Sequence, residues 1–215
     1  MAQRSFVVTR KKRSVKPEKH AARERLLRAA LDIFTETGYA LTSVREIVEA
    51  ARVTKPVLYY YFGSKEGIYM ELMTEPFKVL EKILEETAHE EISSRERVMQ
   101  MYNRIFLLSI ENLKAARLMY SIYYGPPQGA PFLDFEAYHL KIREFTGLIV
   151  KDGIKNGEFR PVNADTLTWV LIGALNFVFE EQLCHRSPMI DKKGLSSMLA
   201  LIFDGVASLK SQGKR

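Results

Sequence analysis

The residues best suited to chemistry lie in one short segment, TKPVLYYYFGSK, at positions 54–65. Lysine ammonium and tyrosine hydroxyl groups can hydrogen-bond both the edges of nucleic-acid bases and phosphate oxygens. Thr54 is a good helix N-cap, and Pro56 falls in the first turn, where a missing amide hydrogen costs nothing. A short helix is therefore predicted, and it should end at Gly63. Its three consecutive tyrosines point about 100° apart, so at least one of them must be exposed.

Two other groups of residues could support enzyme chemistry. The pairs Glu86–His89 and Glu136–His139 both read Glu-x-x-His, the half-motif that, when doubled and joined by two further Glu, builds a di-iron site in a helical bundle. The first pair lies in EETAHEE, which has the character of a solvated helix end. Cys184 and His185 are adjacent, so on a helix they diverge and cannot form a nucleophile–base pair. No phosphate-binding or dinucleotide-binding glycine motif occurs. We therefore expect a protein that is not an enzyme and has no metal and no cofactor, with the di-iron enzyme as the alternative.

The helices that must position segment 54–65 can be read upstream of it. From Arg23 the apolar residues recur at helical spacing, and Gly38 stands where a left-handed cap would end the helix. Ser43 and Glu46 form a capping box that opens a second, short helix. Only Arg52 and Val53 separate this helix from the third. Two short helices joined by a tight turn make a helix-turn-helix, whose second helix enters the major groove of DNA.

The rest of the chain is also predicted to be helical. A long fourth helix should open near Ser64 and run to about Ala88, and the later helices are expected at 94–111, 113–124, 132–154, 164–185 and 194–210. The strongest break is GPPQGAP at 125–131, where three prolines and two glycines forbid helix continuation. No segment alternates as a half-buried strand does. The predicted fold class is all-α, with a basic flexible arm at 1–22, a three-helix helix-turn-helix domain at 23–66 and a larger helical domain at 67–210.

Composition narrows the class of protein further. The chain has 215 residues, of which 47% are hydrophobic and 27% charged, so it should fold around a substantial core. Its single cysteine indicates a reducing compartment. The longest nearly apolar run, at 169–179, is far shorter than the ~20 residues of a bilayer-spanning helix. The N-terminus lacks the apolar core of a secretory signal. We expect a cytoplasmic protein with no membrane partner.

Positive charge is concentrated at the N-terminal end. Residues 1–28 carry 10 Lys and Arg against 2 Asp and Glu, whereas the net charge of the whole chain is +6. This segregation predicts a polyanionic partner for that end. The basic cluster at Arg10, Lys11, Lys12, Arg13 and Lys16 can contact phosphates or the minor groove, or it can be a solvated tail. An anionic membrane is a weaker alternative, because the arm lacks apolar anchors on one face.

The segment SVREIVEAARVTKPVLYYYFGSKEGIYMEL resembles the DNA-binding signature of the TetR/AcrR family of transcriptional repressors. The resemblance covers about residues 23–75. It implies a helical repressor that is a homodimer through its last two helices and binds double-stranded DNA at a palindromic operator. It also implies that the larger domain binds a small-molecule effector, expected here to be hydrophobic, which loosens DNA binding.

The resemblance also implies roles for individual residues. The positions that match base contacts of the family are Lys55, Pro56, Val57 and Tyr59, and those that match phosphate contacts are Thr42, Ser43, Arg45, Tyr60, Tyr61 and Lys65. Two positions depart from the pattern. Arg52 stands where the family most often has Gly, and Val48 stands where a small Ala is common, so the geometry of the turn is left open. The small residues of the Gly63–Gly67 junction predict a hinge there.

The second half of the chain offers a pocket and a dimer seam. Aromatic residues and Met crowd 99–138, next to the Pro/Gly loop, and fit a largely apolar pocket with a few hydroxyls. The candidate pocket residues are Met101, Tyr102, Phe106, Met119, Tyr120, Tyr123, Phe135, Tyr138, Trp169 and Asn176. The candidate dimer residues form helical stripes: Leu167, Leu171, Ala174, Val178, Leu195, Met198, Leu199, Ile202 and Val206. Stripes of this kind are also typical of a core.

Overall fold

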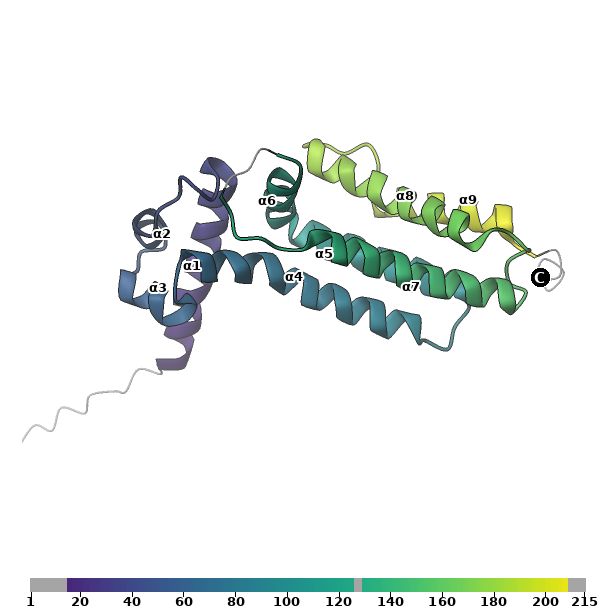
Figure 1. The fold of residues 1–215 in the computed structure, drawn as a ribbon, viewed down its shortest axis with the longest axis horizontal. Helices are drawn as coiled ribbons and strands as arrows, with labels where there is room; N and C mark the ends of the chain where they lie inside the picture. The colour runs from purple at the N-terminus through teal and green to yellow at the C-terminus, as the bar shows by residue number, and fades with distance from the viewer. Residues whose placement is uncertain (1–14, 126–128, 209–215) are drawn as a thin grey trace, which may run out of the picture.

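The computed structural model describes residues 15–125 and 129–208, and these residues fold into an all-α structure, as predicted (Figure 1). The described part contains no named strand, and its one isolated antiparallel bridge joins Phe159 to Ala207. The helices are α1 (Val15–Thr37), α2 (Val44–Ala50), α3 (Lys55–Phe62), α4 (Lys65–Ala88), α5 (Ser94–Glu111), α6 (Leu113–Tyr124), α7 (Phe135–Lys155), α8 (Ala164–Cys184) and α9 (Lys192–Val206).

Three helix starts differ from those predicted. Helix α1 begins at Val15 rather than Arg23, so the last part of the expected flexible arm is helical. The basic cluster from Arg10 to Arg13 lies outside the described residues, as does the side chain of Lys16. Helix α7 starts late, because the Asp134 carboxylate accepts the amide hydrogen of Ala137 and caps it there. Helix α9 starts early, because Asp191 caps the amides of Lys193 and Gly194.

The side chains form two cores that share helix α4. The N-terminal core contains Leu26, Phe34, Ile47 and Leu58 from α1 to α3, together with Ile68, Tyr69 and Met73 of α4 and Ala115 and Leu118 of α6. The second core begins on α4 at Leu80 and gathers α5, α7, α8 and α9. Figure 1 shows α1 to α3 at one end of the elongated molecule and α4 running from them along the other helices. The N-terminal core thus extends past residue 66, where we expected the boundary.

The junction between α3 and α4 is tightly packed. Gly63 ends α3 with a φ of 72°, and the Ser64 hydroxyl caps α4 by accepting from the Gly67 amide at 2.9 Å. A Cβ on Gly67 would lie 1.8 Å from the backbone oxygen of Phe62, so glycine allows the end of α3 to approach α4. The feature that interrupts α4 lies further along, at Pro76. A proline inside a helix removes one backbone hydrogen bond and favours a bend.

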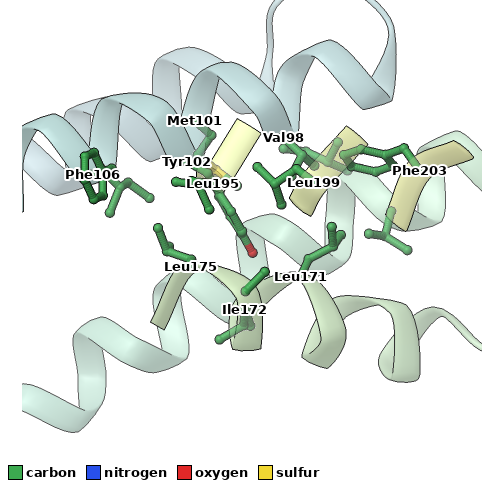
Figure 2. Close-up of a cluster of buried hydrophobic side chains, with 14 of the residues drawn as sticks. Val98, Met101, Tyr102, Phe106, Leu171, Ile172, Leu175, Leu195, Leu199 and Phe203 are labelled. Atoms are coloured by element: carbon green, nitrogen blue, oxygen red, sulfur yellow. The ribbon is translucent and has the colours of Figure 1, made fainter. Parts of the chain in front are cut away.

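The apolar stripes predicted as the dimer seam lie largely inside the second core. Leu167, Leu171, Ala174, Val178, Leu195 and Leu199 are all buried within one chain, and Met198, Ile202 and Val206 pack against them half-buried. Figure 2 shows Leu171, Leu195 and Leu199 among Val98 and Tyr102. Six of these residues are therefore enclosed in the core of a single chain and do not form a surface for a partner, whereas Met198, Ile202 and Val206 stay partly exposed and remain predicted dimer contacts.

Helix α8 is also long and apolar enough, by length and composition alone, to cross a membrane. Packing accounts for part of that composition, since Leu171, Leu175 and Val178 are buried against the neighbouring helices. The exposed face of α8 carries other apolar residues, Val170 at 48% exposure and Phe177 at 55%. On α9, Leu201 is 75% exposed. These residues, rather than the buried part of the predicted stripes, could meet a partner.

Candidate nucleic-acid interface and ligand cavity

Helix α2 begins with the capping box that the sequence predicts. The Ser43 hydroxyl accepts a hydrogen bond from the Glu46 amide at 3.2 Å, and the Ser43 amide donates to the Glu46 carboxylate at 2.7 Å. These hydrogen bonds lower the pKa of Glu46. Ser43 is exposed, and its hydroxyl keeps a proton that it can donate to a phosphate. The cap therefore fixes the start of α2 and leaves the predicted phosphate contact possible.

Arg52 lies in the turn between α2 and α3, whose geometry the sequence left open. Its φ is 53°, within the left-handed region that glycine adopts most easily. The Arg52 amide donates to the Glu49 oxygen at 3.1 Å, and the Val53 amide donates to the Val48 oxygen at 3.0 Å. Val48 itself is buried. Arginine thus occupies a backbone conformation suited to glycine, and its side chain is exposed beside α3.

Helix α3 presents most of the predicted base contacts to solvent. Lys55, Pro56 and Tyr59 are exposed, whereas Val57 is half-buried and packs against the N-terminal core. Leu58 is fully buried and anchors the helix. Thr54 occupies the N-cap position, but its side chain makes no capping hydrogen bond. The N-terminal half of α3 is therefore an exposed surface on a helix that is fixed from behind.

The predicted phosphate contacts divide into two groups. Tyr60 is 71% exposed, and its ring meets that of Tyr61 edge-on with the centroids 4.9 Å apart. Arg45 is exposed and pairs with Glu49 on the same helix at 2.7 Å. A pair of this kind on the surface contributes little to stability. Ser43, Arg45 and Tyr60 are thus exposed, whereas Tyr61 is half-buried and packs against the N-terminal core.

Thr42 is a correction to the predicted phosphate contacts, and Lys65 has a second role, in the structure, that the sequence did not predict. Thr42 is only 2% exposed, and its hydroxyl donates to the Gly38 oxygen at 2.8 Å. Lys65 is half-buried, and its ammonium donates to the backbone oxygens of Tyr39 at 2.9 Å and Thr42 at 2.8 Å. Both residues hold the α1–α2 connection together. The sequence could not show this, because Lys65 and Tyr39 lie far apart along the chain.

Arginines of α1, which we did not predict as positioning residues, hold the helices behind this surface. Arg23 forms an ion pair with Glu71 of α4, and its guanidinium lies 5.7 Å from the centre of the Phe62 ring. Arg25 donates to the backbone oxygen of Ala51 at 3.0 Å, at the end of α2. These contacts connect α1 to α2, α3 and α4. The start of α4 therefore belongs to the same unit as the helix-turn-helix.

A cavity of about 130 Å³ opens among α4, α5, α6, α7 and α8. Six of the predicted pocket residues line it: Phe106, Met119, Tyr120, Phe135, Tyr138 and Asn176. We missed the contribution of α4, which includes Leu72, Met73, Pro76 and Phe77, because their spacing also fits an ordinary core stripe. Phe77 and Tyr138 stack with their centroids 3.6 Å apart. The cavity thus adjoins the helix that reaches the helix-turn-helix.

Four predicted pocket residues do not line this cavity. Met101 and Tyr102 are fully buried in the second core, where the Tyr102 hydroxyl and Thr146 Oγ1 lie 3.1 Å apart. Tyr123 is 45% exposed, and its ring meets that of Tyr124 edge-on. For these three the prediction is wrong, because the direction in which a residue faces from its helix decides whether it meets core, cavity or solvent. Trp169 lines an adjacent groove instead.

This groove, of about 740 Å³, lies between α6, α7 and α8. It shares Tyr120, His139, Ile142 and Asn176 with the cavity, so these four side chains form the boundary between the two spaces. Burial raises the pKa of Tyr120 to about 12. Burial also lowers the pKa of His139, against a smaller opposite effect of Glu136. Both boundary side chains are therefore neutral near pH 7.

The alternative of a di-iron enzyme finds no support in the described residues. Within 15–125 and 129–208, no three His, Cys, Asp or Glu side chains gather as metal ligands would. Glu86 instead accepts from Arg104 at 2.5 Å, and this bond lowers its pKa. His139 lies at the boundary of the cavity, on a different helix from Glu86.

Comparison with known proteins connects this geometry to regulators of transcription. Residues 26–72 match the model of a family described as bacterial regulatory proteins, tetR family. YhgD, an HTH-type transcriptional regulator of Bacillus subtilis, is 25% identical over 182 residues, which are 82% of this chain and 91% of that protein. The HTH-type transcriptional repressor KstR2 of Mycolicibacterium smegmatis is 24% identical over 90% of this chain and 93% of its own length. The crystal structure of PfmR from Thermus thermophilus, a TetR family regulator, superposes with a TM-score of 0.66 at 25% identity, covering 84% of this chain and 97% of that one.

Proposed function

Because this chain belongs to the TetR family of DNA-binding transcriptional regulators, we propose that it is a cytoplasmic repressor that leaves its operator when a small hydrophobic ligand binds. The observation that carries the proposal is the exposed N-terminal half of α3, with Lys55, Pro56 and Tyr59 on its surface. A helix fits the major groove, where lysine and tyrosine can reach base edges. Ser43, Arg45, Tyr60 and Tyr61 would hold the phosphates on either side.

A palindromic operator requires two copies of this helix, so we propose a homodimer. Its interface would use the exposed apolar face of α8 and α9, defined by Val170, Gly173, Phe177 and Leu201. A Cβ added at Gly173 would meet no atom within 4 Å, so the backbone of α8 is open to close approach by a partner there. Figure 1 shows α8 and α9 together along one long edge of the molecule.

Ligand binding in the cavity could affect DNA binding through helix α4. Leu72, Met73 and Pro76 line it on α4, and the first part of α4 is bound to the helix-turn-helix through Glu71 and Lys65. A ligand that favours a different bend at Pro76 would move both recognition helices of the dimer. It could shift the equilibrium only by its difference in affinity for the two arrangements.

The proposal is tested by selecting bound fragments from the source genome and titrating the recovered operator against salt. The first 65 residues carry 14 Lys and Arg against 6 Asp and Glu, so affinity should fall steeply with salt. The expected slope of log K against log salt is about −0.9 for each phosphate neutralised. A flat response, or the recovery of no preferred sequence, contradicts DNA binding of this kind.

The dimer is tested separately by sedimentation. Phe177→Glu should give a monomer that has lost operator affinity, because it places a charge in the proposed interface. Val79→Glu is the matched control, since Val79 is 47% exposed but lies on α4, away from that face. A Phe177→Glu protein that remains dimeric would place the interface elsewhere.

A further inference from the structure

The cavity among α4 to α8 is uncharged. None of the described residues that line it is Asp, Glu, Lys or Arg, and the side chains are mostly aliphatic or aromatic. Its polar groups are few, among them Ser109, Asn112 and Asn176. The Ser109 hydroxyl donates to the Ile105 oxygen and the Asn112 side-chain amide donates to the Leu108 oxygen, so both groups are partly occupied by backbone oxygens of α5. This cavity suits the apolar part of a molecule.

The adjoining groove is different, because it contains ionised groups. Arg117 and Arg143 line it together with a single carboxylate, Glu180. Arg117 is engaged at the end of α8, where it donates to the backbone oxygens of Gln182 and Leu183 at 3.2 Å each. Backbone oxygens carry no net charge, so they do not neutralise Arg117. In the described part of the chain Arg117 has no carboxylate within ion-pair distance.

Arg143 is the more available cation. It is exposed on α7, and its guanidinium lies 5.3 Å from the centre of the Trp169 ring across the groove. No carboxylate lies within ion-pair distance of it in residues 15–125 and 129–208. A guanidinium held against an aromatic ring and without an acidic partner is ready to receive a carboxylate, sulfonate or phosphate group.

We propose that the ligand of this protein is an amphipathic anion, with an apolar body in the cavity and an anionic head on Arg143 in the groove. The boundary residues Tyr120, His139 and Asn176 belong to both spaces, so only side chains separate the cavity from the groove, and the proposed ligand would reach across them. The inference rests on the proposed function only in taking the cavity as the effector site. It adds the charge of the ligand and the residue that selects it.

The test compares three twelve-carbon probes with different heads: dodecanoate and dodecyltrimethylammonium, each below its micelle concentration, and dodecan-1-ol, below its solubility limit. Binding to the full-length protein without DNA is followed by fluorescence of Trp169, the sole tryptophan, which lies in the groove. Arg143→Gln should weaken dodecanoate roughly 10-fold and leave dodecan-1-ol within a factor of about 2. Lys151→Gln is the control, because Lys151 is an exposed cation on the same helix outside the groove.

Two further measurements locate the probe. Ala116→Phe, which fills the cavity, should weaken dodecanoate and dodecan-1-ol alike, and far-ultraviolet circular dichroism confirms that the variant is folded. Cys184 is exposed, lines the groove and is the sole cysteine, so dodecanoate should slow its alkylation by iodoacetamide. Unaltered dodecanoate binding in Arg143→Gln, tighter binding of the trimethylammonium probe, or no binding of any probe overturns the inference.

The same variants separate this inference from the proposed function. Dodecanoate that binds through Arg143 but leaves operator affinity unchanged supports the anionic site and contradicts its regulatory role. The opposite result is a ligand that releases the operator although its affinity does not depend on Arg143. That result supports regulation and overturns the anionic site.

Discussion

The ammonium group of Lys65 donates a hydrogen bond to the backbone oxygen of Tyr39 at 2.9 Å and lies 4.2 Å from the centre of the Tyr39 ring. The same group also donates to the Thr42 oxygen, so one side chain from the start of α4 closes the α1–α2 connection. The family resemblance alone predicts that this lysine contacts a DNA phosphate. In this structure it holds together the domain that carries α3.

Replacing Lys65 should therefore destabilise the protein. Lys65→Met keeps the aliphatic stem and removes hydrogen bonds from a charged donor, which should lower the free energy of unfolding by about 2 kcal/mol. Thermal denaturation measures the change, with Lys55→Met as the control at an exposed position. Unchanged stability of Lys65→Met combined with weaker operator binding would instead assign the ammonium to DNA.

The turn at Arg52 allows a stabilising substitution. A residue with a Cβ in the left-handed region costs roughly 1–2 kcal/mol, and Arg52 has a φ of 53°. Arg52→Gly should raise the stability by about 1 kcal/mol, or roughly 2–4 °C in Tm. Arg52→Ala removes the same side chain but keeps the Cβ, so it should show no gain. Equal effects of the two substitutions would indicate that the side chain, and not the backbone, is responsible.

The approach of α3 to α4 depends on Gly67. In Gly67→Ala the new Cβ would meet the Phe62 oxygen at 1.8 Å, so the two helices must separate at a cost of roughly 1–3 kcal/mol. Operator affinity should fall with stability, because α3 moves. Gly147→Ala in α7 is the control, since its Cβ would lie 3.7 Å from Thr168, an ordinary contact, and alanine favours a helix. A Gly67→Ala protein as stable as the parent would show that the junction yields easily and acts as the hinge that the sequence predicts.

Residues that read bases and residues that hold phosphates should respond differently to substitution. Lys55→Ala and Tyr59→Ala should change which sequence is preferred, at ~1–3 kcal/mol for each good base contact. Tyr61→Ala should weaken all sequences alike. Binding-site selection with each variant distinguishes the two effects. If all three lower affinity uniformly, the assignment of α3 as the recognition helix is wrong.

Ligand and operator should affect each other by the same factor. If the ligand lowers operator affinity by a given ratio, saturating operator must lower ligand affinity by that ratio. Trp169 fluorescence gives the ligand affinity with and without operator, and fluorescence anisotropy of labelled DNA gives the converse measurement. Equal ligand affinity in both titrations would show that an occupied cavity does not regulate DNA binding.

Local signals in the sequence predicted the helices well. The bounds of α5 and α6 agree with the predicted 94–111 and 113–124, because Ser93 and Glu96 form a capping box and Asn112 separates the two helices. The helix-turn-helix was equally readable, since Ser43, Gly63 and Ser64 mark its ends. Each of these signals acts within one turn of helix, and tertiary packing does not override it.

Contacts between distant segments could not be predicted in the same way. Periodicity showed that Leu171 and Val178 share a face of α8, but it could not show that this face packs on other helices of the same chain rather than on a partner subunit. It likewise placed Tyr102 among the pocket candidates, although its ring is fully buried in the core. Five helices line one cavity because of the angles at which they cross, and these angles cannot be predicted from a single sequence.

The packing of α6 on α1 has a consequence for how such proteins can be recombined. Ala115 and Leu118 complete the core of the DNA-binding end, although they lie in the second half of the chain. A chimera joined at residue 66 would set the α1 of one protein against the α6 of another, and the mismatched side chains would leave voids or clashes. A functional exchange must carry α4 as far as Met73 and the matching face of α6. An exchange that leaves α6 in place would therefore require compensating substitutions where α1 and α6 meet.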